Sequence, residues 1–358
     1  MTLIPATILT GFLGSGKTTL LKRVLSESHG QKIAVIENEF GEENIDSDIL
    51  VSDRNEQIIQ MSNGCVCCTI REDLRSTLAD LAEKKRKGEL DFDRVVIETT
   101  GLADPGPVAQ TFFMDDEIAG AYLLDSVLTL VDAKHAEAQL DTRQEARRQI
   151  GFADQIFISK TDLVGADEVQ ALMHRIKHMN PRAPQQAVHF GEVPIAKVFD
   201  LKGFNLNTKL DIDPDFLNAD DGHGRAHHDH HGHDHDHEHD HNAEHVHDEH
   251  CDHPHHHAHD DDVKSFVFRN KRAFNPAKLE DFLGAIVQVY GPKMLRYKGV
   301  LNMKGSDRKV IFQGVHQLMG SDLGPKWAAG EEKISKMVFI GIDLPKDIFL
   351  QGLEQCLA

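Results

Sequence analysis

The residues with the clearest chemical potential form a glycine-rich stretch near the N-terminus, GFLGSGKT at positions 11–18. It matches G-x-x-x-x-G-K-[ST] between an apolar run and a helix-like run, the context that a phosphate-binding loop requires. Glycines let the backbone wrap an anion so that NH groups and the next helix N-terminus face phosphate oxygens. A chance glycine-rich turn is the alternative. The predicted nucleotide-binding residues are Gly11, Phe12, Leu13, Gly14, Ser15, Gly16, Lys17, Thr18 and Thr19.

Four residues have predicted roles in phosphoryl chemistry. Lys17 is expected to reach the β and γ phosphates, and the Thr18 hydroxyl to coordinate Mg²⁺. A second acid is needed near that metal, and the strand-like run VVIET supplies Glu98, followed closely by Gly101. A backbone NH near Gly101 is placed to contact the γ phosphate, as switch loops do. Since no water-orienting glutamine or arginine finger stands out, slow hydrolysis by water is expected.

The tetrapeptide SKTD, residues 159–162, bears on the choice of base. The Asp162 carboxylate can accept hydrogen bonds from the N1 and N2 donors of guanine while the Lys160 stem covers the ring, and adenine offers no such donor pair. A solvated helix start capped by Thr161 or Asp162 is the alternative. Ser159 stands where many GTPases have asparagine. Its position after the glycine loop and the acid favours the guanine interpretation, so the predicted nucleotide is GTP.

Three of the five cysteines, Cys65, Cys67 and Cys68, lie within four positions. An odd number of cysteines does not suggest a disulfide framework. Thiols are also normally reduced in the cytoplasm, which is the location expected for this chain. On an extended segment Cys65 and Cys67 point to the same side, and a thiolate group of this kind suits Zn²⁺, Co²⁺ or Cu(I). Redox-active thiols beside a helix start are one alternative, and inert buried cysteines are another.

Residues 222–260 form an insert that holds 18 of the 24 histidines, interleaved with Asp and Glu. It has too few apolar residues to offset the entropy of ordering, so a disordered linker is predicted. A solvated spacer does not need imidazoles, whereas weak multi-site binding of Zn, Ni, Co or Cu does. The predicted metal-binding histidines include His230, His233, His235 and His237.

Charge excludes some partners. The net charge is -19, but 14 of the acids lie between Asp220 and Asp262 against the single base Arg225. The rest of the chain carries 44 acids and 38 bases and has no basic stripe, which argues against nucleic acid. No run of about 18 apolar residues and no signal-peptide pattern occurs, so no membrane partner and a cytoplasmic location are expected.

Strand-like and helix-like segments alternate before the insert, which predicts an α/β fold of the P-loop NTPase type. A mostly parallel sheet with helices on both faces is expected. The predicted strands are 3–10, 32–37, 94–99, 126–132 and 155–160, and the predicted helices are 17–28, 69–87, 142–152 and 167–178. After the insert, strands at 263–270, 295–303, 308–315 and 336–342, with helices at 276–289 and from 346, predict a smaller α+β domain with an antiparallel sheet. The expected organisation is a P-loop domain at 1–212, a linker at 213–262 and a C-terminal domain at 263–358.

Five motifs in order, TGFLGSGKTTLL, AVIENEFGE, NGCVCC, VVIETTGLADPGPV and SKTD, resemble those of the CobW-type P-loop GTPases, and most closely the YjiA-type members. The resemblance covers nearly the whole chain outside the insert. It implies slow GTP hydrolysis coupled to the handling of zinc or cobalt by a cytoplasmic metallochaperone with a client metalloprotein. It also implies that the three clustered cysteines bind metal, with Glu37 and Glu42 at acidic positions linked with that metal.

Two functional classes remain open. One is a GTP-driven metal inserter, in which nucleotide reorders the segment carrying Glu37 and Glu42 and so changes metal affinity. The other is a metal buffer or sensor in which nucleotide turnover is incidental and the histidine insert stores the metal. Slow turnover would be accelerated by the client or by formation of a homodimer.

Overall fold

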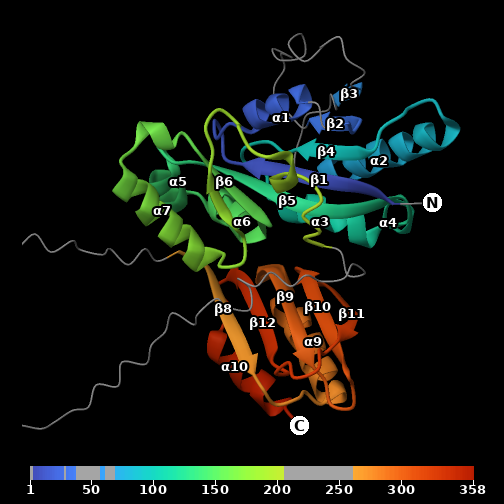
Figure 1. Ribbon diagram of the computed structural model, residues 1–358, viewed down its shortest axis with the longest axis vertical. Helices are drawn as coiled ribbons and strands as arrows, with labels where there is room; N and C mark the ends of the chain where they lie inside the picture. The colour runs from blue at the N-terminus through green and yellow to red at the C-terminus, as the bar shows by residue number, and fades with distance from the viewer. Residues whose placement is uncertain (1–2, 28–29, 38–56, 61–68, 205–260) are drawn as a thin grey trace, which may run out of the picture.

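The computed structural model describes residues 3–27, 30–37, 57–60, 69–204 and 261–358 (Figure 1). Side chains are described for these ranges except 57–60 and 69–73. Several predicted metal-binding residues lie outside the described residues. These are Glu42, Cys65, Cys67, Cys68 and the histidines of the insert, His230, His233, His235 and His237 among them.

The first domain is built on a seven-stranded sheet in the order β3-β2-β4-β1-β5-β6-β7, and every neighbouring pair is parallel. The strands are β1 (Ile4–Gly11), β2 (Ile33–Glu37), β3 (Gln57–Gln60), β4 (Arg94–Glu98), β5 (Tyr122–Asp132), β6 (Gln155–Ser159) and β7 (Gln185–Ala187). The predicted α/β fold class is therefore confirmed. Because all the strands run the same way, their carboxyl ends meet at one edge of the sheet.

Helices cover both faces of this sheet (Figure 1). They are α1 (Lys17–Ser26), α2 (Thr69–Lys87), α3 (Pro105–Met114), α4 (Asp116–Ala121), α5 (Ala136–Thr142), α6 (Gln144–Phe152) and α7 (Ala166–Met179), with short 3₁₀ turns η1 (Thr161–Leu163) and η2 (Ile195–Lys197). In β1, Ala6 and Ile8 join a core cluster with α2, α3, α6 and α7, whereas Leu9 joins a second cluster with α1 and segment 188–201. Burial on both sides explains why the strands are continuously apolar.

The second domain is a five-stranded antiparallel sheet in the order β11-β10-β9-β12-β8. Its elements are β8 (Val263–Asn270), α9 (Pro276–Tyr290), η3 (Gly291–Lys293), β9 (Met294–Asn302), β10 (Arg308–Val315), β11 (Leu318–Lys326), β12 (Ser335–Ile342) and α10 (Lys346–Gln355). One face packs on α9 and α10 through aromatic residues such as Phe266, Tyr297 and Phe349. The smaller α+β domain with an antiparallel sheet is thereby confirmed.

Some elements differ from the sequence-based expectation. The stretch after Gly101 contains helix α3, which Asp104 caps by accepting a hydrogen bond from the Gly106 N–H at 2.8 Å, with Pro105 in the first turn. The helix expected at 142–152 is α6, which begins at Gln144 because Arg143 is extended, and the separate helix α5 before it was not predicted. Strands β3, β7 and β11 were not anticipated, since they are short, partly polar or glycine-containing.

The two domains share one core cluster, which joins Val263, Leu295 and Ile340 of the second sheet to α6 and α7. Ion pairs frame this contact. Asp261 accepts a hydrogen bond from Arg175 Nη2 at 2.7 Å, and Asp262 pairs with Arg147, although both acids fall within the segment expected to be linker. Among the described helices none has the length and apolar character needed to cross a membrane.

Candidate nucleotide site

The glycine loop between β1 and α1 has the backbone conformation that its glycines permit. Gly11, Gly14 and Gly16 all have positive φ, at 144°, 73° and 98°. A Cβ on Gly11 would lie 2.3 Å from the Leu130 carbonyl oxygen, so no other residue fits there. The buried Ser15 hydroxyl has no hydrogen-bond partner within the described part of the chain. A curved backbone, an orphaned hydroxyl and the start of α1 together fit a phosphate group.

Lys17, Thr18 and Glu98 converge at this loop. Lys17 is buried, and its Nζ donates hydrogen bonds to the Gly11 carbonyl at 2.8 Å and the Phe12 carbonyl at 3.3 Å. The Thr18 hydroxyl donates to Glu98 Oε1 at 2.9 Å, although the two residues are 80 positions apart. A hydroxyl beside a carboxylate is a pair of hard oxygen ligands, which suits Mg²⁺.

The loop that follows β4 lies directly on the glycine loop. A Cβ on Gly101 would lie 2.6 Å from the Leu13 backbone nitrogen, so only glycine allows this approach. Gln149 of α6 holds the same loop, because its Nε2 donates to the carbonyls of Gly101 at 3.1 Å and Ala103 at 3.0 Å. The glycine loop and the loop after β4 are therefore in direct contact, so a displacement of one requires a displacement of the other.

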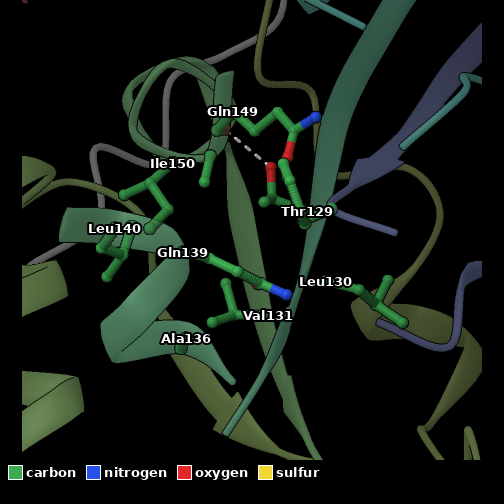
Figure 2. A pocket seen from close by; sticks show the side chains of 10 residues that line it. Thr129, Leu130, Val131, Ala136, Gln139, Leu140, Gln149 and Ile150 are labelled. Carbon is green, nitrogen blue, oxygen red and sulfur yellow. Dashed lines mark hydrogen bonds between the residues drawn. The ribbon is translucent and has the colours of Figure 1, made fainter. Parts of the chain in front are cut away.

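Figure 2 shows the packing behind these loops, in a cavity of about 10 Å³ between β5, α5 and α6. Thr129 of β5 donates a hydrogen bond to the Gln149 carbonyl at 2.9 Å. Phe12 of the glycine loop also lines this cavity. Space on this scale admits about one water molecule, so the side chains around Gln149 are closely packed.

Lys160 and Asp162 follow β6 at the same sheet edge. Lys160 has a positive φ of 56°, and its Nζ donates to Asp132 Oδ2 at 2.7 Å. Burial raises the pKa of Asp132, but hydrogen bonds from Lys160 and His135 outweigh it and hold that pKa below its ordinary value. Asp162 lies in η1 with its side chain half exposed, where it can meet a ligand.

Ser159 contributes to the glycine loop in a way that its sequence position does not reveal. Its hydroxyl donates one hydrogen bond, shared between the Ser15 carbonyl at 2.7 Å and the Val131 carbonyl at 3.3 Å. This residue therefore ties the end of β6 to the phosphate loop.

Glu37 lies beside Glu98 on neighbouring parallel strands. The register of β2 and β4 pairs the two residues directly, and both side chains are buried. Neighbouring strands are about 4.8 Å apart. The predicted metal ligand Glu37 thus adjoins the acid that contacts Thr18, whereas Glu42 and the cysteines lie beyond the described residues.

The comparisons with known proteins agree with this geometry. Residues 5–186 match the model of the CobW/HypB/UreG nucleotide-binding domain, and residues 263–357 match the cobalamin synthesis protein CobW C-terminal domain. This chain belongs to the CobW/HypB/UreG family. The recognition of a CobW-type P-loop GTPase from the motifs is confirmed.

Individual relatives extend this result to the whole chain. The protein is 38% identical to the zinc chaperone YjiA of Escherichia coli K12 over 345 residues, which are 96% of each chain. It is 32% identical to the zinc chaperone CobW of Pseudomonas aeruginosa, over 99% of this chain and 92% of that one. The crystal structure of Zn(II)-bound YjiA GTPase from E. coli superposes with a TM-score of 0.73 at 33% identity, covering 100% of both chains.

The sheet edge therefore collects residues from five strand ends, and not all of them carry a sequence signal. Lys17, Thr18, Glu98 and Gly101 lie together as their motifs predict. Asp132 was missed, although it ends a buried strand just as Glu98 does, and that pattern was a usable signal. Gln149, by contrast, is a polar residue within an ordinary helix, and nothing in its sequence neighbourhood marks it.

Proposed function

We propose that this CobW-family protein hydrolyses GTP and uses the change in nucleotide to control a zinc site. The metal is held by Cys65, Cys67 and Cys68 together with Glu37 and Glu42, and it passes to a client metalloprotein. The observation that carries the proposal is the pairing of Glu37 with Glu98 across β2 and β4, because the proposed zinc ligand and the proposed Mg²⁺ ligand are then adjacent and both buried.

The proposed coupling is electrostatic. Two ionised carboxylates about 5 Å apart repel by roughly 3 kcal/mol at an effective dielectric constant of 20. A divalent cation near Thr18 and Glu98 lowers that repulsion, and a cation at Glu37 does the same from the other side. Occupancy of one site therefore alters the affinity of the other, and the effect is reciprocal.

Hydrolysis relies on positioning. Lys17 stabilises charge on the β and γ phosphates, while Thr18 and Glu98 hold Mg²⁺, which neutralises charge on the phosphate oxygens. The Gly101 backbone lies against Leu13 of the glycine loop, which supports a role for its NH as a donor to the γ phosphate. Gln149 Nε2 donates to two carbonyls of the loop after β4, and no residue is assigned to orient the attacking water. Slow intrinsic turnover follows, to be accelerated by the client or a homodimer.

The preference for guanine is inferred from residues at the sheet edge, and the preference for zinc is inferred from the relatives. Guanine is expected to bind through Asp162, with Lys160 covering the ring from its position near Asp132. Zinc is favoured over cobalt or nickel because the relatives with full-length coverage are named zinc chaperones. A thiolate site of this kind needs a reducing compartment, so we place the protein in the cytoplasm.

A metal buffer is the second candidate, supported by the 18 histidines of residues 222–260. Deletion of residues 222–260 separates the two functions. As an inserter, the deleted protein keeps GTP hydrolysis and client metallation and loses only metal capacity. As a buffer, it loses its metal-dependent function.

The zinc site itself is tested in the same insert-deleted background. Zinc content after purification with Mg²⁺ and GTP is measured for the deleted protein and for the deleted protein with Cys67→Ala. The proposal expects about one tightly held zinc in the first and its loss in the second. Stoichiometric zinc in both would refute the thiolate site.

A further inference from the structure

A second cavity, away from the nucleotide site, lies where the two domains meet. It has a volume of about 230 Å³ and is lined by Phe113 of α3, Phe204, and residues of β9, β10 and β11 that include Arg296, Gln313 and Gly320. The β-sheet register explains the space. Gly320 pairs directly with Gln313, so the edge strand β11 places no side chain beside Gln313 on that face.

Polar atoms with unused hydrogen-bonding capacity are buried beside the cavity. Arg296 is 1% exposed, and its Nη2 donates to the Gly203 carbonyl at 2.8 Å and to Asp154 Oδ1 at 3.3 Å. Its Nε and Nη1 have no hydrogen-bond partner in the described part of the chain, and neither has Gln313 Oε1. Leaving a buried donor unsatisfied costs about 1–3 kcal/mol. Acceptor atoms from a ligand would remove this cost for the two Arg296 nitrogens, whereas Gln313 Oε1 is itself an acceptor and needs a donor.

The charges around this point favour an anion. Arg182 and Arg296 both form ion pairs with Asp154. Lys298 is close enough to these three residues for their charges to affect its pKa. Two cations, Arg182 and Arg296, thus face one acid. The remaining walls are aromatic: the Phe204 ring lies 3.4 Å from Arg296 Cζ, and the Phe113 ring centroid lies 5.7 Å from that of Phe204.

We propose that this cavity binds a small organic anion with an apolar, ring-containing body. Its carboxylate or sulfonate oxygens accept hydrogen bonds from Nε and Nη1 of Arg296, and its ring packs against Phe113 and Phe204. Such a ligand touches both domains, and it touches helix α3, which begins four residues after Gly101. The proposal does not depend on the metal or on the chaperone function.

The test uses the full-length protein saturated with Mg²⁺ and GDP, so that the phosphate loop is blocked. The probe is 8-anilinonaphthalene-1-sulfonate, an aromatic sulfonate whose fluorescence rises in apolar sites, with benzoate and neutral benzyl alcohol as competitors. Gly320→Leu fills the cavity and leaves Arg296 intact. Ser321→Leu is the matched control, since the next residue of β11 faces the other side of the sheet.

The proposal expects saturable probe binding to the wild type and to Ser321→Leu, and at least tenfold weaker binding to Gly320→Leu. Benzoate displaces the probe and benzyl alcohol does not. Arg296→Gln weakens binding similarly, and if that variant fails to fold, the two leucine variants decide alone. The proposal is overturned if the probe does not bind or if it binds the two leucine variants with equal affinity. It is also overturned if both competitors displace the probe equally, because the probe would then be an adventitious additive only.

Discussion

The two sheets of this protein place their charged residues in different ways. In the parallel sheet, Glu37, Glu98 and Asp132 each end a strand, and Lys17 starts the helix after another. In the antiparallel sheet, Arg296 and Lys298 lie in the middle of a strand and project from one face. The first arrangement follows from strand direction and the second from side-chain alternation.

Because of this difference, the strand-end residues of the first sheet have their partners within one domain, whereas Arg296 of the second sheet has its partner in the other domain. Residues at the strand ends meet within one domain, where loops can rearrange around a ligand without disturbing the core. Arg296 finds its carboxylate, Asp154, only across the domain boundary. We therefore expect substitutions at the strand ends to affect catalysis, and those at the boundary to affect stability.

The largest effect is expected for Lys17→Ala at the strand-end site. Loss of an ammonium that stabilises transferring phosphate should lower GTP hydrolysis by ~10²-fold or more. Phosphate release under single-turnover conditions measures this, and thermal melting should show near-normal stability. Lys22→Ala, further along α1, is the control and should retain full activity. Equal rates for the two variants would remove Lys17 from the site.

A smaller catalytic loss is expected for Gly101→Ala. The added methyl group would lie 2.6 Å from the Leu13 nitrogen, so the two loops must separate. We expect about a tenfold lower kcat for GTP, an order-of-magnitude figure for a misplaced catalytic loop. Gly120→Ala in α4 is the matched control, because a Cβ there meets nothing within 4 Å. A wild-type kcat for Gly101→Ala would show that the loop contact is dispensable.

At the domain boundary, Asp154→Asn should change stability more than activity. Burial raises the pKa of Asp154, but Arg182 and Arg296 outweigh that effect and keep the pKa below its ordinary value. Removing this acid leaves two buried cations without their partner, at a cost of about 3 kcal/mol. Thermal melting should show a Tm lower by about 6–12 °C. Exposed Asp116→Asn is the control, and an equal Tm for both variants would contradict the role of the boundary.

The smallest effect is expected at Lys298, and it depends on pH. Burial, with the charges of Arg182 and Arg296, lowers the pKa of Lys298 from 10.5 to about 7. Between these values the unfolded chain binds a proton that the folded chain does not, so this contribution to stability rises with pH. Lys298→Met should therefore stabilise the protein by about 1 kcal/mol at pH 6.5 and by less at pH 9.5. A Tm difference from wild type that stays constant between these pH values would contradict the assignment.

Predictability from sequence follows the same division between the sheets. The strand-end site is largely readable, because glycine spacing and a terminal acid such as Glu98 are local signals. Local signals do not report which strands become neighbours, so the register of Glu37 against Glu98 was not accessible. The cavity beside Arg296 could not be predicted from local signals either. It depends on Gly320, which lies opposite Gln313, and on contact with a second domain. Helix α3 was hidden because its Asp104–Pro105 start is also typical of a turn.

The most direct test of the account compares zinc affinity in two nucleotide states. Protein lacking residues 222–260 is titrated with Zn²⁺ in the presence of Mg²⁺ with GDP or with a non-hydrolysable GTP analogue. Coupling between Glu37 and Glu98 predicts dissociation constants that differ at least fivefold, in line with couplings of about 1–3 kcal/mol, and Glu37→Gln should abolish the difference. Identical zinc affinities in the two states of the unsubstituted protein would contradict the central claim.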